Sequence, residues 1–481
     1  MTKGQFTALI FCLIGGMTAA NATGRTSKAA KAADVWAQGR AIAESIELPV
    51  IPLDSVYTIT DFGASRNADS KTNAKAINAA IDKANENGGG RVFIPYGEWK
   101  TCAITLKSHV DLHLENGATL LFDTDPNLYL PVVRTRWEGL DCYNLHPLIY
   151  AKGAADISIS GEGTIDGQAS NEYWWPMTGV ARFGYKAGMI KNNNGDDRSG
   201  RPLLSKMERE KVDAEERIMG IRDGLRPQLI NFYECERVMI EGVTLRNSPF
   251  WVIHPCFVKE LTVRDVVIIS HGPNSDGCDP EGCKNVLIDN CFFDTGDDCI
   301  AIKSGRNNDA RAINIPTENV IVRNCRMKNG HGGVVIGSEI GSGFKNLWVE
   351  DCQMDSPELE RVIRIKTNPC RGGVIEGVNV RNVTVGQCRE AVLKINLDYE
   401  PRENCDRSFP PTVRNVNIEN VTSQKSKYGV LIIGMNESCN VKDIKVTNCS
   451  FNNVEKGNKI TGQVENVTSK NLIINGEKTE L

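Results

Sequence analysis

Carboxylates and an imidazole recur in the second half of the chain at intervals that would stack them in one column. Asp276 is followed by the pair Asp297-Asp298, and His331 follows that pair. Crowded carboxylates suit the cleavage of a glycosidic bond, because one must be protonated to give a proton to the leaving oxygen and another must be ionised to activate water. Like charges in close contact raise the pKa of one carboxyl group, which keeps that proton available near neutrality.

Two basic residues continue the same column. The interval from Asp298 to His331 equals the interval from His331 to Arg364, and Lys366 precedes Tyr399 by the same interval again. Because Arg364 and Lys366 are two positions apart, a strand presents both on one face, where they suit the carboxylate of a sugar acid. The formal net charge of −4 over 481 residues excludes the basic footprint of a nucleic-acid-binding protein, so any attraction for an acidic ligand must be local.

Asp297 and Asp298 are consecutive, and in a regular strand their side chains would point to opposite faces. Gly296 stands directly before them. Glycine permits backbone angles that other residues avoid. We therefore expect a bend or bulge at Gly296 that turns both carboxylates toward one site.

The elements that must position this column are short strands of alternating apolar residues. Nine patterns of this kind, each of three positions, run from Val238-Met239-Ile240 to Leu472-Ile473-Ile474. Asn or Asp stands at fixed positions around most of them and suits corners with left-handed backbone. Such a strand cannot bury its face alone, but stacked coils of about 25–35 residues form one core. The spacing predicts an all-β fold, a single-stranded right-handed parallel β-helix of about ten coils, rather than a β-sandwich, whose hairpin signals are scarce.

The pattern before and between the repeats indicates the domain organisation. Residues 72–87 have the apolar spacing of an amphipathic helix that Gly88-Gly89-Gly90 ends, and a strand follows at 92–94, which predicts an N-terminal α/β cap. The charged segment 168–226 lacks the repeat, and it is either an insertion that forms a binding wall or a solvated decoration. We expect an N-terminal extension at 23–56 and one catalytic domain at 57–481, which includes the cap and the insertion.

Residues 1–22 have the pattern of a secretory signal peptide. Lys3 precedes an apolar run at 6–17, and alanines at 19, 20 and 22 supply small residues for cleavage. The run is too short to span a bilayer, and no other segment has the roughly 20 consecutive apolar residues that a span needs. We expect an exported protein, periplasmic or extracellular, without a membrane span.

The chain contains 16 cysteines. Cys12 lies in the predicted signal peptide, which leaves an odd number, so at least one cysteine is free or intermolecular. In the coil pattern four cysteines take a place that valine takes elsewhere, and these are Cys291, Cys325, Cys352 and Cys449. We expect those four to be small core residues, because a thiol packs as a small apolar group. Sequence alone does not pair the others.

Four segments of the column occur in the order of a known family's motifs. They are Asn274-Ser275-Asp276, Gly296-Asp297-Asp298, Gly330-His331-Gly332 and Arg364-Ile365-Lys366. With residues 161–167, they resemble the motifs of the polygalacturonases, glycoside hydrolase family 28. Ser275 replaces the usual threonine, as in exo-acting members. The insertion and the segments 225–227, 248–251, 254–255 and 337–339 also look like the exo-acting branch.

The resemblance implies an inverting glycoside hydrolase that cleaves α-1,4-galacturonosyl linkages of pectin from a chain end, without a metal ion or other cofactor. It implies that Asp297 is the general acid and that Asp276 and Asp298 position and deprotonate the water. His331 would tune the ionisation of the acid. The substrate, a pectic polysaccharide or oligogalacturonide, would be bound by Arg364, Lys366, Tyr399 and Asn274. We expect a monomer with no nucleic-acid partner.

Other functions are possible on such a scaffold. A rhamnogalacturonan or xylogalacturonan hydrolase is one alternative, although Asp297-Asp298 together with Arg364-Ile365-Lys366 favours galacturonate beside the scissile bond. A pectate lyase would need calcium and would leave an unsaturated, UV-absorbing product. A third alternative is a carbohydrate-binding or structural β-helix without catalytic activity. Loss of catalysis in Asp297→Asn, with fold and binding retained, would exclude it.

Overall fold

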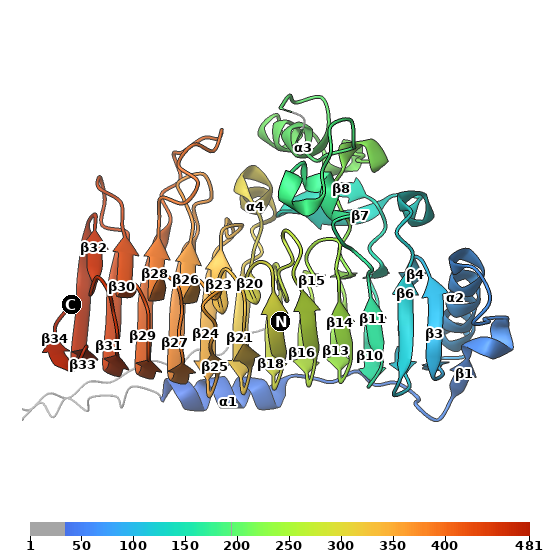
Figure 1. Ribbon diagram of the computed structural model, residues 1–481, viewed down its shortest axis with the longest axis horizontal. Helices are drawn as coiled ribbons and strands as arrows, with labels where there is room; N and C mark the ends of the chain where they lie inside the picture. Colours follow the sequence, from blue (N-terminus) through green and yellow to red (C-terminus); the bar gives the residue numbers. More distant parts are fainter. Residues whose placement is uncertain (1–33, 194) are drawn as a thin grey trace, which may run out of the picture.

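The computed structural model describes residues 34–193 and 195–481, and these form a right-handed parallel β-helix (Figure 1). The predicted signal peptide at 1–22 lies outside the described residues. Successive coils pair in parallel and contribute strands to three ladders. Among the named strands of the described chain, pairing is antiparallel only at β7–β8 and β33–β34. The predicted fold class is confirmed.

The first ladder is the longest and runs the length of the molecule. In order of pairing it contains β1 (Val56–Thr58), β2 (Gly90–Ile94), β5 (Val110–Leu114), β10 (Ala155–Gly161), β13 (Glu236–Glu241), β16 (Lys259–Arg264), β18 (Lys284–Asp289), β21 (Thr317–Arg323), β24 (Phe344–Glu350), β27 (Val374–Val385), β29 (Thr412–Ser423), β31 (Val441–Phe451) and β33 (Val464–Ile474). The short β34 (Glu477–Thr479) folds back on β33. The second ladder contains β3 (Gly97–Thr101), β6 (Ala118–Phe122), β11 (Thr164–Asp166), β14 (Thr244–Arg246), β17 (Val267–Ser270), β19 (Phe292–Thr295), β22 (Arg326–Met327) and β25 (Gln353–Met354), and it then joins the second half of β27.

The third ladder carries the polar column. Its strands are β4 (Ile104–Thr105), β9 (Ile149–Lys152), β12 (Ile230–Tyr233) and β15 (Ile253–Cys256), and then β20 (Ile300–Ile302), β23 (Val334–Gly337), β26 (Arg361–Lys366), β28 (Ala391–Asn396), β30 (Tyr428–Ile433) and β32 (Lys459–Thr461). Isolated bridges connect the two runs, from Cys278 to Ile253 and Ile300 and from Glu281 to Cys256 and Lys303. The coil that contains Asp276 therefore has no regular strand here, only isolated bridges.

The apolar repeats stack as predicted, with one correction at the end. Val238 pairs with Leu261, which pairs with Val286, and this register continues to Ile444. In the last coil Ile444 pairs with Val467, whereas the predicted partner Leu472 lies opposite Cys449. The reason is that β33 carries apolar residues on both sides of its corner, so alternation alone did not distinguish the two positions. The four predicted core cysteines are buried.

Asparagines with left-handed backbone recur from coil to coil, as the sequence predicted: one bends the start of a first-ladder strand, and another, such as Asn290 or Asn324, lies at the corner with the second ladder. Asn285 and Asn319 have φ of 60° and 58°, in the left-handed region that asparagine tolerates. Their side chains also connect coils, because Asn319 Nδ2 donates to Asn285 Oδ1 at 2.8 Å and Asn346 Nδ2 donates to Asn319 Oδ1 at 3.0 Å. Each of these asparagines thus bends the backbone of its own coil and, through its side-chain hydrogen bond, fixes the alignment of that coil with the next.

The N-terminal cap is confirmed. Helix α2 (Ser70–Glu86) begins where the Asp69 carboxylate accepts a hydrogen bond from Thr72 N at 2.7 Å. Its apolar face, which includes Ile77, Ile81 and Ala84, is buried against the first coil. Gly90, at φ 156°, leads into β2 at a place where a Cβ would lie 2.5 Å from Ser55 O.

Helix α1 (Val35–Ser45) lies outside the coils, along the outer face of the first ladder (Figure 1). It covers Leu287, Ile321 and Trp348, which project outward from three consecutive coils. Trp348 Nε1 donates to Val35 O at 2.8 Å, and Gly39 allows the helix to approach, since a Cβ there would lie 2.8 Å from the Trp348 ring. The chain then returns to the cap.

The segment 168–226 is an insertion above the coils, with α3 (Gly200–Arg209) as its only α-helix in the described part of that range (Figure 1). It packs on a hairpin that the sequence analysis did not foresee, β7 (Val133–Trp137) and β8 (Leu140–Asn144). Trp137, Leu204 and Phe250 belong to the small apolar core between them. Helix α4 (Asn307–Ile313) follows β20 on the same side. None of the helices in the described ranges has the length and apolar character that crossing a membrane requires.

Candidate active site

The structure brings the predicted column together. Asp276, Asp297 and Asp298 offer carboxylate oxygens that all lie within 4.8 Å of one another. His331, which precedes β23, lies with Nδ1 3.0 Å from Asp297 Oδ1. A cleft with a volume of about 420 Å³ is lined by Asn274, Asp276, Asp297, His331, Arg364, Lys366 and Tyr399, together with residues that the sequence analysis did not single out.

The bend at Gly296 explains how consecutive aspartates serve one cluster. β19 ends at Thr295 and β20 begins at Ile300, so Asp297 and Asp298 lie in the turn between ladders and not in a strand. A Cβ at Gly296 would collide with Gly272 O, so only glycine fits where this turn packs on the preceding coil. The expectation of a bend is confirmed.

The two neighbouring aspartates nevertheless have different surroundings. Asp297 lines the cleft, whereas the Asp298 side chain is fully buried. Lys366 Nζ donates to Asp298 Oδ2 at 2.7 Å, and Arg364 Nη1 lies 3.5 Å from Oδ1. Both basic side chains come from β26, on one face of the strand as predicted. They cover Asp298 on the side of the cleft.

Tyr399 and Asn274 complete the predicted set. The Tyr399 ring lies 5.5 Å from the Arg364 guanidinium carbon and 5.4 Å from Lys366 Nζ, within the range of cation–π contacts. Asn274 Oδ1 accepts a hydrogen bond from the buried Arg226 at 2.8 Å, which fixes the orientation of the amide. Both side chains therefore border the cleft in defined positions.

Burial and neighbouring charge set the ionisation of the acids. Burial, with the charges of Asp279 and Asp297, raises the pKa of Asp276 well above its ordinary value. Burial also acts to raise the pKa of Asp297, but the hydrogen bond and charge of His331 outweigh it and hold that pKa below its ordinary value. The same hydrogen bond raises the pKa of His331. The cluster therefore contains one carboxyl with a raised pKa, that of Asp276, and one ion pair, between Asp297 and His331.

A second charged pair, which the sequence analysis missed, adjoins Asp276. Lys303 Nζ lies 2.9 Å from Glu339 Oε2 and 4.0 Å from Asp276 Oδ2. Burial acts to lower the pKa of Lys303, but Glu339, Asp279 and Asp276 outweigh it and raise it well above the ordinary value. Lys303 and Glu339 are about one coil apart in sequence, so a search for opposite charges at coil spacing would have found them.

Comparisons with known proteins agree on one family. Residues 222–473 match the model of glycosyl hydrolases family 28. The solved structure of a hyperthermoactive exopolygalacturonase from Thermotoga maritima is 36% identical, with a TM-score of 0.87, over 93% of this chain and 98% of that chain. An exo-poly-alpha-D-galacturonosidase of Dickeya chrysanthemi is 26% identical over 81% of this chain and 66% of that protein. An endo-polygalacturonase of Pectobacterium carotovorum is 27% identical over 84% of this chain and 89% of that protein.

The family match covers the coils that carry the acids, the histidine and the basic pair, and the structural match extends over the cap and the insertion. The resemblance that the four motif segments indicated is thereby confirmed. This protein belongs to the glycosyl hydrolases of family 28.

Proposed function

We propose that the protein hydrolyses α-1,4-galacturonosyl linkages of polygalacturonate and releases sugar from a chain end, with inversion at the anomeric carbon. One observation carries the proposal. The acids Asp276 and Asp297 line the same cleft as Arg364 and Lys366, so a bond beside a sugar carboxylate is presented to the acids. The relatives, an exopolygalacturonase from Thermotoga and an exo-poly-alpha-D-galacturonosidase from Dickeya, support the same substrate and mode of action.

In the proposed reaction Asp297 donates a proton to the glycosidic oxygen while the bond from that oxygen to the anomeric carbon breaks. A water molecule attacks the same carbon from the opposite face and gives a proton to Asp298, or to Asp276 when that carboxyl, whose pKa is raised, is ionised. The nearest oxygens of these acids lie within 4.8 Å, closer than the roughly 6.5–9.5 Å usual between the carboxyls of inverting enzymes. Inversion is therefore inferred from the family and not from this separation.

Substrate binding favours protonation of Asp297, the proposed general acid, whose pKa its neighbours hold below the ordinary value. The charge of Lys366 helps to hold the pKa of Asp297 low. A uronate carboxylate that pairs with Lys366 cancels that influence, so the pKa of Asp297 rises when the site is filled. His331 Nδ1, 3.0 Å from Asp297, is positioned to pass its proton to the carboxylate. His331 is thus a positioning and proton-storing residue.

The volume of the cleft supports release from a chain end. A volume of about 420 Å³ lies toward the lower end of the roughly 300–1,000 Å³ of small-molecule sites, whereas internal cutting needs a groove open at both ends. The relatives include exo- and endo-acting enzymes, so their names alone do not decide the mode. Chromatography of early products decides it, since a ladder of intermediate oligomers without predominant monomer or dimer would contradict release from an end.

The acid assignment is tested with Asp297→Asn on polygalacturonate, followed by NMR of the anomeric configuration. General acid catalysis contributes roughly 10²–10⁴-fold, so we expect a loss of that size with substrate binding retained. Asp289→Asn is the matched control, because Asp289 accepts from Arg323 on the outside of the coils. Retention of more than half of the wild-type turnover by Asp297→Asn would refute the assignment, and turnover of rhamnogalacturonan in preference would refute the substrate.

We also infer that the protein is exported and acts as a monomer. The pattern at 1–22 supports export, and so does the disulfide between Cys370 and Cys405, because disulfides persist in oxidising compartments. N-terminal sequencing of the protein from periplasm and medium tests the first inference, and light scattering after size-exclusion chromatography tests the second. A chain that retains residues 1–22 in the cytoplasm, or a stable dimer, would contradict them.

A further inference from the structure

A second cavity lies beside the catalytic cleft. Its volume is about 640 Å³, and Arg201 and Glu400 line both spaces. The cleft is bordered by Glu138, from the tip of the β7–β8 hairpin, and the second cavity by Arg306 and Glu403. The residues between the two spaces therefore determine whether a ligand can occupy only the catalytic cleft or a longer site formed by the cleft and the second cavity together.

These residues form a chain of alternating charges. Arg201 Nε lies 2.8 Å from Glu138 Oε2, and the same oxygen lies 3.3 Å from Arg306 Nη1. Arg306 Nη2 then lies 2.8 Å from Glu403 Oε1. Arg371 Nη1 donates to both oxygens of Glu403 at 2.7 Å. The chain of ion pairs joins five segments that are remote in sequence: helix α3 of the insertion, the hairpin tip, the start of α4, the loop between β26 and β27, and the loop between β28 and β29.

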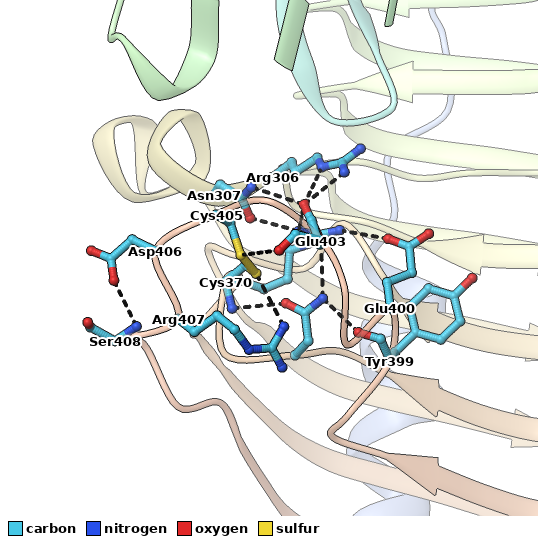
Figure 2. The surroundings of a disulfide bond; sticks show 12 residues. Arg306, Asn307, Cys370, Tyr399, Glu400, Glu403, Cys405, Asp406, Arg407 and Ser408 are labelled. Carbon is cyan, nitrogen blue, oxygen red and sulfur yellow. Dashed lines mark hydrogen bonds and ion pairs between the residues drawn. A yellow bond between two sulfur atoms is a disulfide. The ribbon is translucent and has the colours of Figure 1, made fainter. Parts of the chain in front are cut away.

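Backbone contacts and a disulfide hold this chain in place. Arg306 N donates to Gly139 O at 3.0 Å, and a Cβ at Gly139 would lie 2.9 Å from the Glu339 Cβ, so the hairpin tip docks directly on the cleft wall. At the other end Cys370 precedes Arg371, and its partner Cys405 follows Glu403 two positions later. Figure 2 shows Glu403 between Arg306 and the disulfide.

The charges of the chain cancel internally. The three cations Arg201, Arg306 and Arg371 face three carboxylates, those of Glu138, Glu403 and Glu400, the last 3.7 Å from Arg371 Nη2. Ion pairs that are satisfied within the wall offer no spare cation to a uronate of the substrate. The wall therefore limits the ligand by occupying space, whereas Arg364 and Lys366 attract it.

We propose that this chain of ion pairs is a partition that sets how many sugar residues the site can hold, and that Glu138 is its specificity-determining residue. Glu138 is the carboxylate that bridges Arg201 and Arg306, so its loss separates these two guanidinium groups. The contacts of Glu208 with Asn308 and of Arg217 with Asp309 still hold the insertion on α4, so the change is confined to the wall between the two spaces. The cleft and the second cavity then become one elongated site that accepts an internal segment of the polymer. The proposal rests on the proposed release from a chain end.

The test compares wild type, Glu138→Gln and the control Glu241→Gln on polygalacturonate. Glu241 pairs with Arg264 on the coil surface, so its change removes an ion pair far from the cleft. For Glu138→Gln we expect a several-fold larger loss of viscosity per bond cleaved and the early appearance of oligomers longer than the dimer. We expect KM to fall as the chain length of the oligogalacturonide increases, a dependence that loss of stability alone would not produce.

Unchanged products and unchanged viscosity loss in a folded Glu138→Gln would overturn the partition. Where that variant does not fold, Arg201→Gln makes the same test, because Arg201 is the most exposed of the three arginines. A product ladder from the wild type would instead refute release from a chain end, whatever the variants do. The failure of the partition and the failure of the proposed function therefore give different results.

Discussion

The disulfide between Cys370 and Cys405 should keep the loop that carries Tyr399 and Glu403 closed against the cleft. This loop occupies positions 397–411, between β28 and β29. In the chain-entropy model, a cross-link between cysteines that are 35 residues apart in sequence stabilises by about 4 kcal/mol. Since about 1.4 kcal/mol is a factor of ten, the double variant Cys370→Ser/Cys405→Ser should open the loop roughly 10²–10³-fold more often.

Native-state proteolysis measures this opening. Trypsin cleaves after arginine, and Arg407 lies inside the loop with its guanidinium 3.3 Å from Asp398. When opening and closing are fast, the cleavage rate follows the population of the open form, so cleavage after Arg407 should accelerate roughly 10²–10³-fold. Reductant should have the same effect on wild type, and Cys439→Ser, which removes a free cysteine elsewhere, should have none. A rate within threefold of wild type in the double variant would show that the ion pairs of Glu403 hold the loop without the disulfide.

Four further outcomes are expected. Lys366→Met leaves the buried Asp298 with only the longer contact to Arg364. The free energy of unfolding in urea should therefore fall by about 3 kcal/mol and KM for charged substrate should rise, and an unchanged urea midpoint would refute this role of Lys366. The His331–Asp297 pair should stabilise fully between the ordinary pKa values of 3.8 and 6.5, because folding lowers the pKa of the carboxyl and raises the pKa of the imidazole. Its contribution should be lost as pH falls below 3.8 through the lowered pKa of Asp297, or rises above 6.5 through the raised pKa of His331, and urea midpoints of His331→Gln that track wild type at all pH values would contradict this. Trp348→Ala should cost about 3–5 kcal/mol and release α1 to protease, which a protected α1 would disprove. A methyl-esterified galacturonide should turn over more slowly than the free acid, with a difference that narrows as pH falls.

The column of polar residues and the coils that carry it were predictable because, in a solenoid, residues one coil apart in sequence become neighbours in space. His331 and Arg364 are about one coil apart in sequence and meet the same cluster, since each coil returns the chain to the same ladder. Asn285 and Asn319 are recognisable for a similar reason, because the bend at the start of a first-ladder strand recurs with left-handed backbone from coil to coil. The burial of Asp298 was not visible, because position in a turn does not tell which of two consecutive side chains faces the solvent.

The partition was not predictable from spacing. Glu138 and Arg306 are 168 residues apart, and Arg306 and Glu403 are 97 apart, so no coil period relates them. They meet because loops of different length leave the coils on the same side and pack on one another. The disulfide between Cys370 and Cys405 was more accessible to prediction from the sequence. The two cysteines are 35 residues apart, about one coil, and neither belongs to the predicted valine and cysteine column.

The esterified substrate tests whether the basic pair does more than bind. In the empty cleft Lys366 and Arg364 contact Asp298, and Lys366 also holds the pKa of Asp297 below its ordinary value. A free uronate competes for these cations and so lets Asp297 take up the proton it must donate, whereas a neutral ester leaves them with the enzyme's own carboxylates. The ester should therefore reduce kcat as well as raise KM. Lowering the pH protonates Asp297 without help from the substrate, so kcat for the two substrates should converge in acid. A ratio of kcat values that does not change with pH would show that the cations only bind the sugar and that the proton on Asp297 has another origin.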